Sequence, residues 1–207
     1  LLSHGVFHMT AHIVLASGSE IRAHLLRQAG IEFETDVPRL DERAIKAALM
    51  AEQAPPRDIA DALAEAKARK ISAKHPGRLV LGCDQVLDFE GQLLSKPASA
   101  EVALSQLKEM RGKRHMLLSA AVIYRDGEPI WRHVGQVRLV MRNCSDAYLE
   151  NYVNRNWDSI RHAVGAYKLE EEGVRLFASI EGSYFNVLGL PLMELISYLG
   201  LQGVIEQ

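Results

Sequence analysis

The chain has 207 residues, of which 48% are apolar and 24% are charged, and its formal net charge is −2. This length allows one sizeable domain or two small lobes with a real core, and the composition is ordinary for a soluble globular protein. The acidic balance and the lack of an aromatic–basic cluster argue against a dedicated nucleic-acid-binding module. No apolar run approaches the roughly 20 residues of a membrane span, so we expect no membrane attachment.

The cysteines and the N-terminal residues suggest a simple organisation. Cys83 and Cys144 are too few and too isolated for a disulfide framework or a zinc site, so we expect reduced thiols in a cytoplasmic protein. Residues 1–8 have neither the charged region nor the long apolar core of a signal peptide. We treat residues 1–10 as an N-terminal extension and residues 11–207 as a single domain.

The first predicted unit is a strand, a small polar turn and a helix. Residues 12–16 (HIVLA) predict the strand, Ser17-Gly18-Ser19 the turn, and residues 20–29 the helix, with Ser17 and Glu20 at capping-box spacing. Free backbone N–H groups at such a helix start suit an anion, which Arg22 could also reach. The alternative is an ordinary strand-to-helix turn, and the GxxxxGK[ST] pattern of a Walker A loop is absent.

An acidic pair follows the second predicted strand. Residues 31–37 predict that strand, and Asp41 and Glu42 lie in a loop that leads into a helix over residues 44–50. Two adjacent acids alone indicate no particular chemistry.

The next helix, predicted from Asp58 to about Lys74, carries a lysine in an unusual position. Lys67 falls in the middle of the apolar stripe formed by Ile59, Leu63 and Ile71. An unpaired buried ammonium is costly, so Lys67 either extends to the edge of the apolar surface or pairs with an anion.

The central stretch, residues 78–97, joins a carboxylate to a second lysine. Residues 79–81 predict a short buried strand, and Asp84 appears where this apolar run ends. After a turn the chain returns in extended form, with Lys96 held out of helix by the proline that follows it. A carboxylate at a strand end and a lysine on the return limb could converge on one ligand, holding a metal ion and neutralising phosphate oxygens. Alternatively, Asp84 caps a loop and Lys96 is solvated.

The second half of the chain predicts further strands and helices around one long hairpin. His115 begins a strand, and a lone histidine in that place is expected to be structural. The remaining elements complete an α/β or α+β fold around a mixed sheet. They are a helix over 99–110, strands over 115–124 and 130–142 joined by a turn at Asp126-Gly127, a helix from Ser145 to about Asn154, a loop over 154–162, strands over 165–169 and 174–180, a loop over 182–189, and a helix over 192–199 with Pro191 at its first position.

Five motifs in order resemble the Maf family. They are LASGSEIRAHLL (residues 15–26), LAEAKA (63–68), GCDQV followed by LLSKP (82–97), VGAY (164–167) and GLPL (189–192). The resemblance runs from about residue 12 to residue 201. Any one of these motifs is a weak signal, whereas the ordered set is specific.

The resemblance implies both a fold and an activity. The fold is α/β, an elongated mixed sheet with flanking helices and two lobes around a cleft, similar to inosine triphosphate pyrophosphatases. The activity is hydrolysis of a nucleoside triphosphate between its α- and β-phosphates, giving a monophosphate and pyrophosphate, with Mg²⁺ or Mn²⁺ as cofactor. Such proteins often act as homodimers and are thought to remove non-standard nucleotides or to restrain septum formation.

The resemblance also implies roles for individual residues. Asp84 matches the proton acceptor that prepares the attacking water, Lys67 and Lys96 match lysines that hold phosphate oxygens, and Glu42 matches a glutamate that helps with metal or water. Asp84 and Glu42 are therefore the expected metal-binding residues. The triphosphate is expected at the first motif, near Ser17, Ser19, Ile21 and Arg22.

This chain departs from the family pattern in the first motif. The usual SPRR is here Ser19-Glu20-Ile21-Arg22, so Ile21 removes one cationic donor and Glu20 adds a negative charge near the expected phosphate site. These changes motivate an alternative, a nucleotide-binding regulator of septum formation with little catalytic activity.

Two positions bear on the nucleotide. Gln85 and Glu170 stand where the branch of the family preferring 7-methyl-GTP has glutamine and glutamate, whereas the branch that takes dTTP and UTP has threonine and glutamine. A carboxylate is also a suitable partner for the N–H donors of a guanine edge. Ile21 departs from the first branch, which has tryptophan there. These positions favour 7-methyl-GTP.

Overall fold

The computed structural model describes residues 12–206, so the predicted extension over residues 1–10 lies outside the described residues. One mixed sheet runs through the described chain in the order β2-β1-β3-β5-β6-β7, and β4 pairs with β3. The strands are β1 (Ile13–Ala16), β2 (Phe33–Thr35), β3 (Leu79–Phe89), β4 (Gln92–Leu94), β5 (Arg114–Arg125), β6 (Glu128–Met141) and β7 (Phe177–Glu181). β1 is parallel to β2 and β3, and the remaining pairs are antiparallel.

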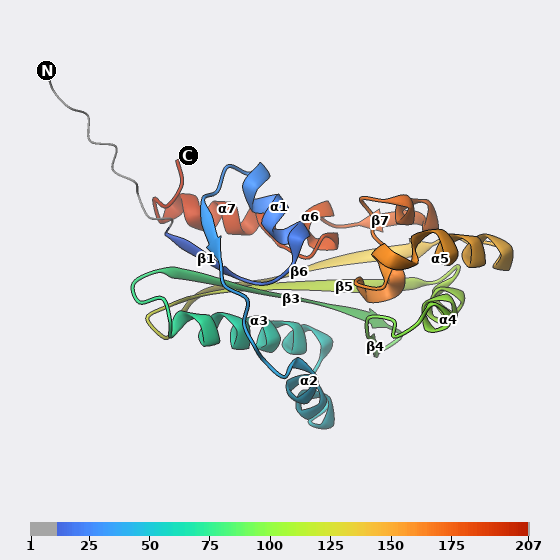
Figure 1. Ribbon diagram of the computed structural model, residues 1–207, viewed down its shortest axis with the longest axis horizontal. Coiled ribbons are helices and arrows are strands. Elements are labelled where there is room, and N and C mark those ends of the chain that lie inside the picture. The colour runs from blue at the N-terminus through green and yellow to red at the C-terminus, as the bar shows by residue number, and fades with distance from the viewer. Residues whose placement is uncertain (1–11, 207) are drawn as a thin grey trace, which may run out of the picture.

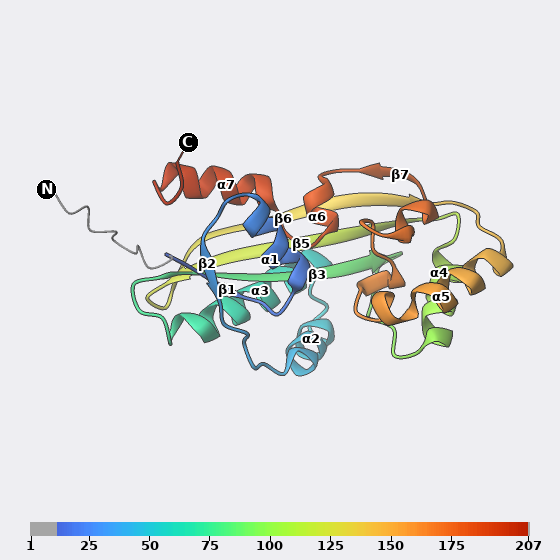
Figure 2. The same ribbon diagram turned by 45° about the horizontal axis from the view of Figure 1, so that its top comes forward.

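Helices cover both faces of this elongated sheet. Figures 1 and 2 show α3 beneath one face, α1, α6 and α7 above the other, and α4 and α5 at the far end. The helices are α1 (Glu20–Gln28), α2 (Glu42–Ala51), α3 (Pro56–Ser72), α4 (Ala100–Met110), α5 (Asp146–Ile160), α6 (Tyr184–Val187) and α7 (Leu192–Leu201), with two 3-10 turns, η1 (Val164–Ala166) and η2 (Glu172–Leu176).

Three buried clusters fill the space between these layers. One lies between the sheet and α3, one lies under α1 and α7, and one lies at the far end with α4 and α5. Apolar side chains of β1 and β3 belong alternately to the first and to the second of these clusters, because successive side chains point to opposite faces of a sheet. This arrangement confirms the expected α/β fold with an elongated mixed sheet and flanking helices. Within residues 12–206, none of the helices is long and apolar enough to span a bilayer.

β3 is longer than the sequence predicted, and Asp84 lies in its middle rather than at its end. The single acid interrupted the apolar run and suggested a strand end after Leu81. The strand continues because β5 pairs with it without a break from Val80 to Asp88. Both faces are covered, so its side chains are buried on both sides as in the interior of a layered fold.

Gly82 allows α3 to lie directly on β3. A Cβ atom at this position would stand 2.2 Å from the Ala64 carbonyl oxygen and 2.6 Å from the Ala68 amide nitrogen. Since these are backbone atoms of α3, only a glycine permits the contact. The close approach places Lys67, on the turn between them, beside the middle of β3.

Several other predicted boundaries were wrong. α5 continues to Ile160, because Val153, Trp157 and Ile160 extend its apolar stripe through a polar stretch. Residues 165–169 do not form a strand, because Gly165 and Ala166 have φ values of 78° and 59° that break an extended chain. Part of the predicted loop over residues 182–189 is the short helix α6, and Pro191 caps α7 instead of occupying its first turn.

The long hairpin is confirmed. Asp126 and Gly127 join β5 to β6 with φ values of 51° and 82°. Positive φ at both central residues is the conformation that a two-residue hairpin turn requires.

Candidate active site

The candidate site lies where one edge of β3 has no neighbouring strand. β1 pairs with β3 as far as Ala16 opposite Gly82, and β4 joins the same edge only at Leu94 opposite Leu87. No strand of the described chain pairs with β3 on that side between these two points. Side chains from both faces of the sheet can therefore reach this edge, which we call the β3 gap.

Lys67 enters the β3 gap from the α3 face. Its Nζ lies 2.7 Å from Asp84 Oδ1 and 3.2 Å from Glu42 Oε2, and it donates to the Cys83 carbonyl oxygen at 3.4 Å. The Lys67 and Asp84 side chains are only 9% and 10% exposed, whereas Glu42, at the start of α2, is 50% exposed. Lys67 thus pairs with anions, which decides between the two alternatives that the sequence left open.

Arg22 enters the β3 gap from the opposite face, on α1. Its guanidinium is buried and donates to the Gly189 carbonyl oxygen at 2.8 Å, to Ser17 Oγ at 3.2 Å and to the Cys83 carbonyl oxygen at 3.4 Å. The Cys83 carbonyl therefore accepts from cations on both faces. Two elements far apart in sequence, α1 and α3, are held at one point of β3.

The charges of the site favour an additional anion. Burial raises the pKa of Asp84, and the nearby Lys67 and Arg22 charges oppose this rise. The buried groups are two cations and one carboxylate, and Glu42 is half in solvent. Phosphate oxygens brought to this edge would face an excess of positive charge in a poorly solvated environment, where electrostatic attraction is strong.

The turn before α1 differs in detail from the prediction. Ser19, not Ser17, caps the helix and accepts from the Arg22 amide, while Ser17 Oγ accepts from the Ser19 amide and from the Arg22 guanidinium. Ser17 is buried and fixes Arg22, so its hydroxyl was not available for the predicted capping box. Ile21 packs against the apolar cluster under α1 and α7, and Glu20 is exposed in the first turn.

Lys96 is not paired with Asp84. It is exposed, and within residues 12–206 it makes no hydrogen bond or ion pair. β4 is antiparallel to β3, so the chain after Leu94 runs back along β3 in the direction of the β3 gap. Lys46 of α2 donates to Ser95 at 3.4 Å, which ties this return limb to the helix that carries Glu42.

Gln85 and Glu170 lie apart from the charged cluster. Gln85 follows Asp84 in β3 and so points to the other face of the sheet, where its amide nitrogen contacts α6. Glu170 is exposed between the two 3-10 turns, η1 and η2. The structure therefore places the predicted specificity residues on the α6 side and Lys67, Asp84 and Glu42 on the α3 side.

Asp84 and Glu42 are the side chains available for a metal ion. Within the described part of the chain, no group of three or more His, Cys, Asp or Glu side chains is arranged to bind one. The Lys67 ammonium lies between the two carboxylates. Two carboxylates fit Mg²⁺ or Mn²⁺ when substrate phosphates and water complete the coordination, which is how Mg²⁺ is usually held.

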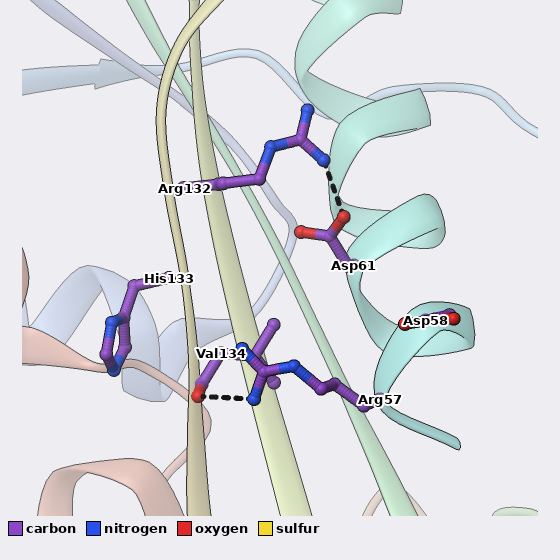
Figure 3. Close-up of a pocket in the computed structure, with 6 residues that line it drawn as sticks. All are labelled: Arg57, Asp58, Asp61, Arg132, His133 and Val134. Carbon is purple, nitrogen blue, oxygen red and sulfur yellow. Dashed lines mark hydrogen bonds and ion pairs between the residues drawn. The ribbon is translucent and has the colours of Figure 1, made fainter. Parts of the chain in front are cut away.

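A polar hollow of about 230 Å³ between α3 and β6 is a separate feature. Figure 3 shows the Arg132 guanidinium reaching Asp61 of α3, and Arg57 of α3 reaching the Val134 carbonyl of β6. Both arginines already donate to protein acceptors. We therefore infer that these two arginines hold the first half of α3, the helix that carries Lys67, against β6.

The sequence profile of the family described as Maf-like protein matches residues 12–201. The chain belongs to this family. The matched range includes every residue of the β3 gap described above.

Similar proteins carry informative names. A protein of Ruegeria sp. (strain TM1040) named nucleoside triphosphate pyrophosphatase is 75% identical, and the match covers 96% of this chain and 100% of that protein. A protein of Caulobacter vibrioides with the same name is 50% identical, and the match covers 93% of this chain and 96% of that protein. A relative in Brucella abortus named 7-methyl-GTP pyrophosphatase is 43% identical, covering 96% and 100%. A solved nucleoside-triphosphatase of the dITP/XTP pyrophosphatase type from Mycobacterium abscessus is 15% identical with a TM-score of 0.38, covering 94% of this chain and 97% of that one.

Sequence reasoning missed several groups of this Maf-like protein. The Cys83 and Gly189 carbonyls are backbone acceptors, which no side-chain pattern reveals. Ser119 and Asn186, which contact each other and Gln85, are buried polar residues among apolar neighbours. That isolation was the available signal, since buried polar groups are normally hydrogen-bonded to something specific.

Proposed function

We propose that this Maf-like protein is a nucleoside triphosphate pyrophosphatase that cleaves the bond between the α- and β-phosphates. The observation that carries the proposal is the convergence of Lys67, Asp84 and Arg22 on the β3 gap from two faces of the sheet. The names of relatives at 75% and 71% identity support the same activity. A carboxylate beside buried cations is suited to prepare a water molecule and to stabilise charge on phosphate oxygens.

In the proposed reaction the Asp84 carboxylate accepts a proton from a water molecule. The water oxygen forms a bond to the α-phosphorus, and the bond from this phosphorus to the oxygen that bridges to the β-phosphate breaks. A nucleoside monophosphate and pyrophosphate leave. Lys67 keeps its 2.7 Å contact with Asp84 and so holds the carboxylate in place, while the N–H donor that contacts Glu42 turns to the phosphate oxygens.

Arg22 and Lys96 have different parts in this proposal. Arg22 is engaged with three protein acceptors and holds Ser17 and Gly189 at the β3 gap, so it shapes the phosphate site more than it reaches into it. Lys96 is exposed on the return limb and is free to turn toward the outer phosphates. Ser19 and Ile21, at the start of α1, present the helix N-terminus, where backbone N–H groups favour anions.

Asp84 and Glu42 are proposed to hold Mg²⁺ or Mn²⁺ together with the phosphates. The ion would neutralise developing negative charge on the triphosphate. For this to occur, the Lys67 ammonium must give up its contact with Glu42 while it keeps its contact with Asp84. The triphosphate itself supplies the anionic partner that lets it do so.

The preferred nucleotide is proposed to be 7-methyl-GTP. Gln85 and Glu170 match the branch of the family with this preference, and the relative in Brucella abortus bears that name. A cytoplasmic homodimer that binds no nucleic acid is part of the same proposal.

The test is pyrophosphate release with Mg²⁺ or Mn²⁺ from 7-methyl-GTP, GTP, dTTP, UTP and CTP. Asp84→Asn is expected to lower kcat by about 10²–10⁴-fold, the usual contribution of a general base. Asp158→Asn, an exposed acid of α5, is the matched control and should leave turnover unchanged. Undiminished turnover by Asp84→Asn would refute the role of Asp84.

Other outcomes of this panel separate the alternatives. A preference for dTTP and UTP would keep the enzyme and refute the argument from Gln85 and Glu170. Tight nucleotide binding without pyrophosphate release would instead favour the regulator of septum formation. Ile21, which packs against the core and supplies no phosphate donor, is the feature that motivates that alternative.

A further inference from the structure

Three neighbouring strands each contribute one residue to a row that lies under α6. Gln85 of β3 lies opposite Ser119 of β5, and Ser119 lies opposite Gly135 of β6. Because the row is directly across the strands, all three residues belong to the same face of the sheet. This is the face opposite to Asp84.

All three residues of the row contact α6. The Gln85 amide nitrogen lies 3.0 Å from Ser119 Oγ, 2.9 Å from the Asn186 carbonyl oxygen and 3.0 Å from the Val187 carbonyl oxygen. Ser119 Oγ donates to the Asn186 carbonyl oxygen at 2.6 Å. At Gly135 a Cβ atom would stand 2.3 Å from the Asn186 side-chain amide, so that amide occupies the space a side chain would fill.

The NH₂ group of Gln85 is therefore committed to the protein. This group has two hydrogens, and the three oxygen atoms around it already receive them. Donation from this group to a nucleobase would cost these partly buried contacts. At this position, which the sequence associates with the preferred nucleotide, the NH₂ group contacts α6.

The segment from α6 to Gly189 connects two parts of the proposed nucleotide site. At one end the Gly189 carbonyl accepts from the Arg22 guanidinium, which also holds Ser17 at the phosphate end. At the other end Tyr184, the first residue of α6, is 47% exposed with its ring edge-on to Phe185. The pKa of Tyr184 is raised, first by burial and then by the charge of Glu170.

We infer that Tyr184 is the residue on which the nucleobase stacks, and that Gln85 is a positioning residue that sets the nucleotide preference by holding α6. This inference rests on the proposed function. An exposed aromatic ring suits a purine that carries positive charge, such as 7-methylguanine, because the ring face attracts cations. Among the exposed large apolar side chains of the described residues, only Tyr184 is aromatic, and the others lie outside α6.

The first experiment compares kcat and KM of Tyr184→Ala, Tyr184→Phe and wild type with 7-methyl-GTP. Tyr184→Ala should raise KM roughly tenfold with little change in kcat, as expected for loss of base stacking on an aromatic ring. Tyr184→Phe keeps the ring and should lose much less. Met193→Ala, at an exposed apolar position of α7, is the control and should match wild type. An unchanged KM for Tyr184→Ala would overturn the inference.

The second experiment tests how Gln85 acts. If Gln85 works by holding α6, then Gln85→Met raises KM, and combining it with Tyr184→Ala adds little further loss, since both changes remove the same contact. If the two losses in KM multiply, Gln85 contacts the base independently and the positioning role is wrong. Ser119→Ala should raise KM with kcat unchanged, as Gln85→Met does.

A binding measurement separates this inference from the proposed function. Calorimetric titration of the Asp84→Asn protein with 7-methyl-GTP and with inorganic pyrophosphate, each with Mg²⁺, should show that adding Tyr184→Ala weakens only nucleotide binding. Equal weakening of both ligands would overturn the base-stacking role. Wild-type protein that releases no pyrophosphate from any nucleotide would refute the proposed function instead.

Discussion

Lys67 Nζ lies 2.7 Å from Asp84 Oδ1, and both side chains are about nine-tenths buried. The pair joins the helix α3 to the centre of the strand β3 at the one place where that strand has a free edge within the described chain. A buried ion pair is weak evidence for stability, because the loss of hydration offsets much of the attraction. Its presence here is better explained by chemistry that needs a carboxylate and an ammonium side by side.

Removing both partners of this pair should cost less stability than the two single changes added together. Lys67→Met leaves the Asp84 carboxylate buried without its strongest partner, and we expect a loss of about 3 kcal/mol in the free energy of unfolding. The double variant Lys67→Met/Asp84→Asn should lose less than the sum of the two single changes, by about 1 kcal/mol or more. Urea denaturation of the four proteins measures this coupling.

The control for this cycle is Lys74→Met, at an exposed lysine beyond the end of α3. It should change the free energy of unfolding by no more than about 0.5 kcal/mol. Strict additivity of the Lys67 and Asp84 changes would contradict the contact.

The pH dependence of activity should report on Asp84. Burial raises the pKa of Asp84 above its ordinary value of 3.8, so the acidic limb of the kcat/KM profile should lie above that pH. Lys67 is the strongest of the influences that oppose the rise. Lys67→Met, although slower, should therefore shift the midpoint of the limb to higher pH. A midpoint that stays in place or moves to lower pH would show that another group controls the limb.

The raised pKa of Asp84 also makes the stability of the folded protein depend on pH. A carboxyl group whose pKa is higher in the folded state holds its proton more tightly there than in the unfolded chain. Stability then falls as pH rises from the unfolded pKa to the folded pKa and is constant above it. Asp84→Asn, which cannot titrate, should flatten this part of the stability curve.

Gly82 should tolerate no side chain. Gly82→Ala would force its Cβ against the Ala64 carbonyl oxygen and the Ala68 amide nitrogen, so α3 must move away from β3. We expect a loss of about 1–3 kcal/mol in the free energy of unfolding. Because the movement separates Lys67 from Asp84, turnover should fall as well, measured by pyrophosphate release.

Ala68→Gly should not rescue this variant. The Ala68 methyl is also close, at 2.9 Å from the added Cβ, but removing it leaves both backbone atoms in place. If stability and turnover recovered fully in Gly82→Ala/Ala68→Gly, only the Ala68 methyl group would obstruct the added Cβ, and α3 could stay on β3.

Periodicity in the sequence was enough to find Lys67 but not its partner. A lysine in an apolar stripe must meet an anion or the solvent, and the local pattern cannot say which residue supplies the anion. Asp84 was placed at a strand end because a single acid broke an apolar run. The pairing of β3 with β5 on one side and the contact with α3 on its face keep the strand regular through Asp84. Both are contacts between segments that lie far apart in the sequence, and a local pattern does not reveal them.

Gln85 illustrates the opposite case, in which a residue was recognised but its contacts were not. Its position next to Asp84 is visible in the sequence. Its three acceptors come from β5 and from α6, about one hundred residues later. α6 was taken for a loop because it has only four residues between glycines, too short for a helical pattern to be evident.

His115 should make the protein less stable in mild acid. His115 is 2% exposed, its Nε2 lies 2.8 Å from the Tyr167 hydroxyl, and its ring packs at a tilt against Phe177. Burial lowers the pKa of His115 from 6.5 to about 4. The folded state therefore keeps the ring neutral while the unfolded chain binds a proton below pH 6.5, so stability is lost as pH falls from about 6.5 to about 4.

Between pH 7 and pH 5 this effect amounts to about 2 kcal/mol. Urea denaturation at both pH values should show that His115→Gln, whose amide can still bond to the Tyr167 hydroxyl, loses less stability than wild type by about this amount. Carboxyl groups that titrate in the same range affect both proteins equally and cancel in the comparison. His162→Gln, at an exposed histidine after α5, should lose as much stability as wild type. If His115→Gln loses as much as wild type too, the buried ring does not remain neutral and its protonation is accommodated in the folded state.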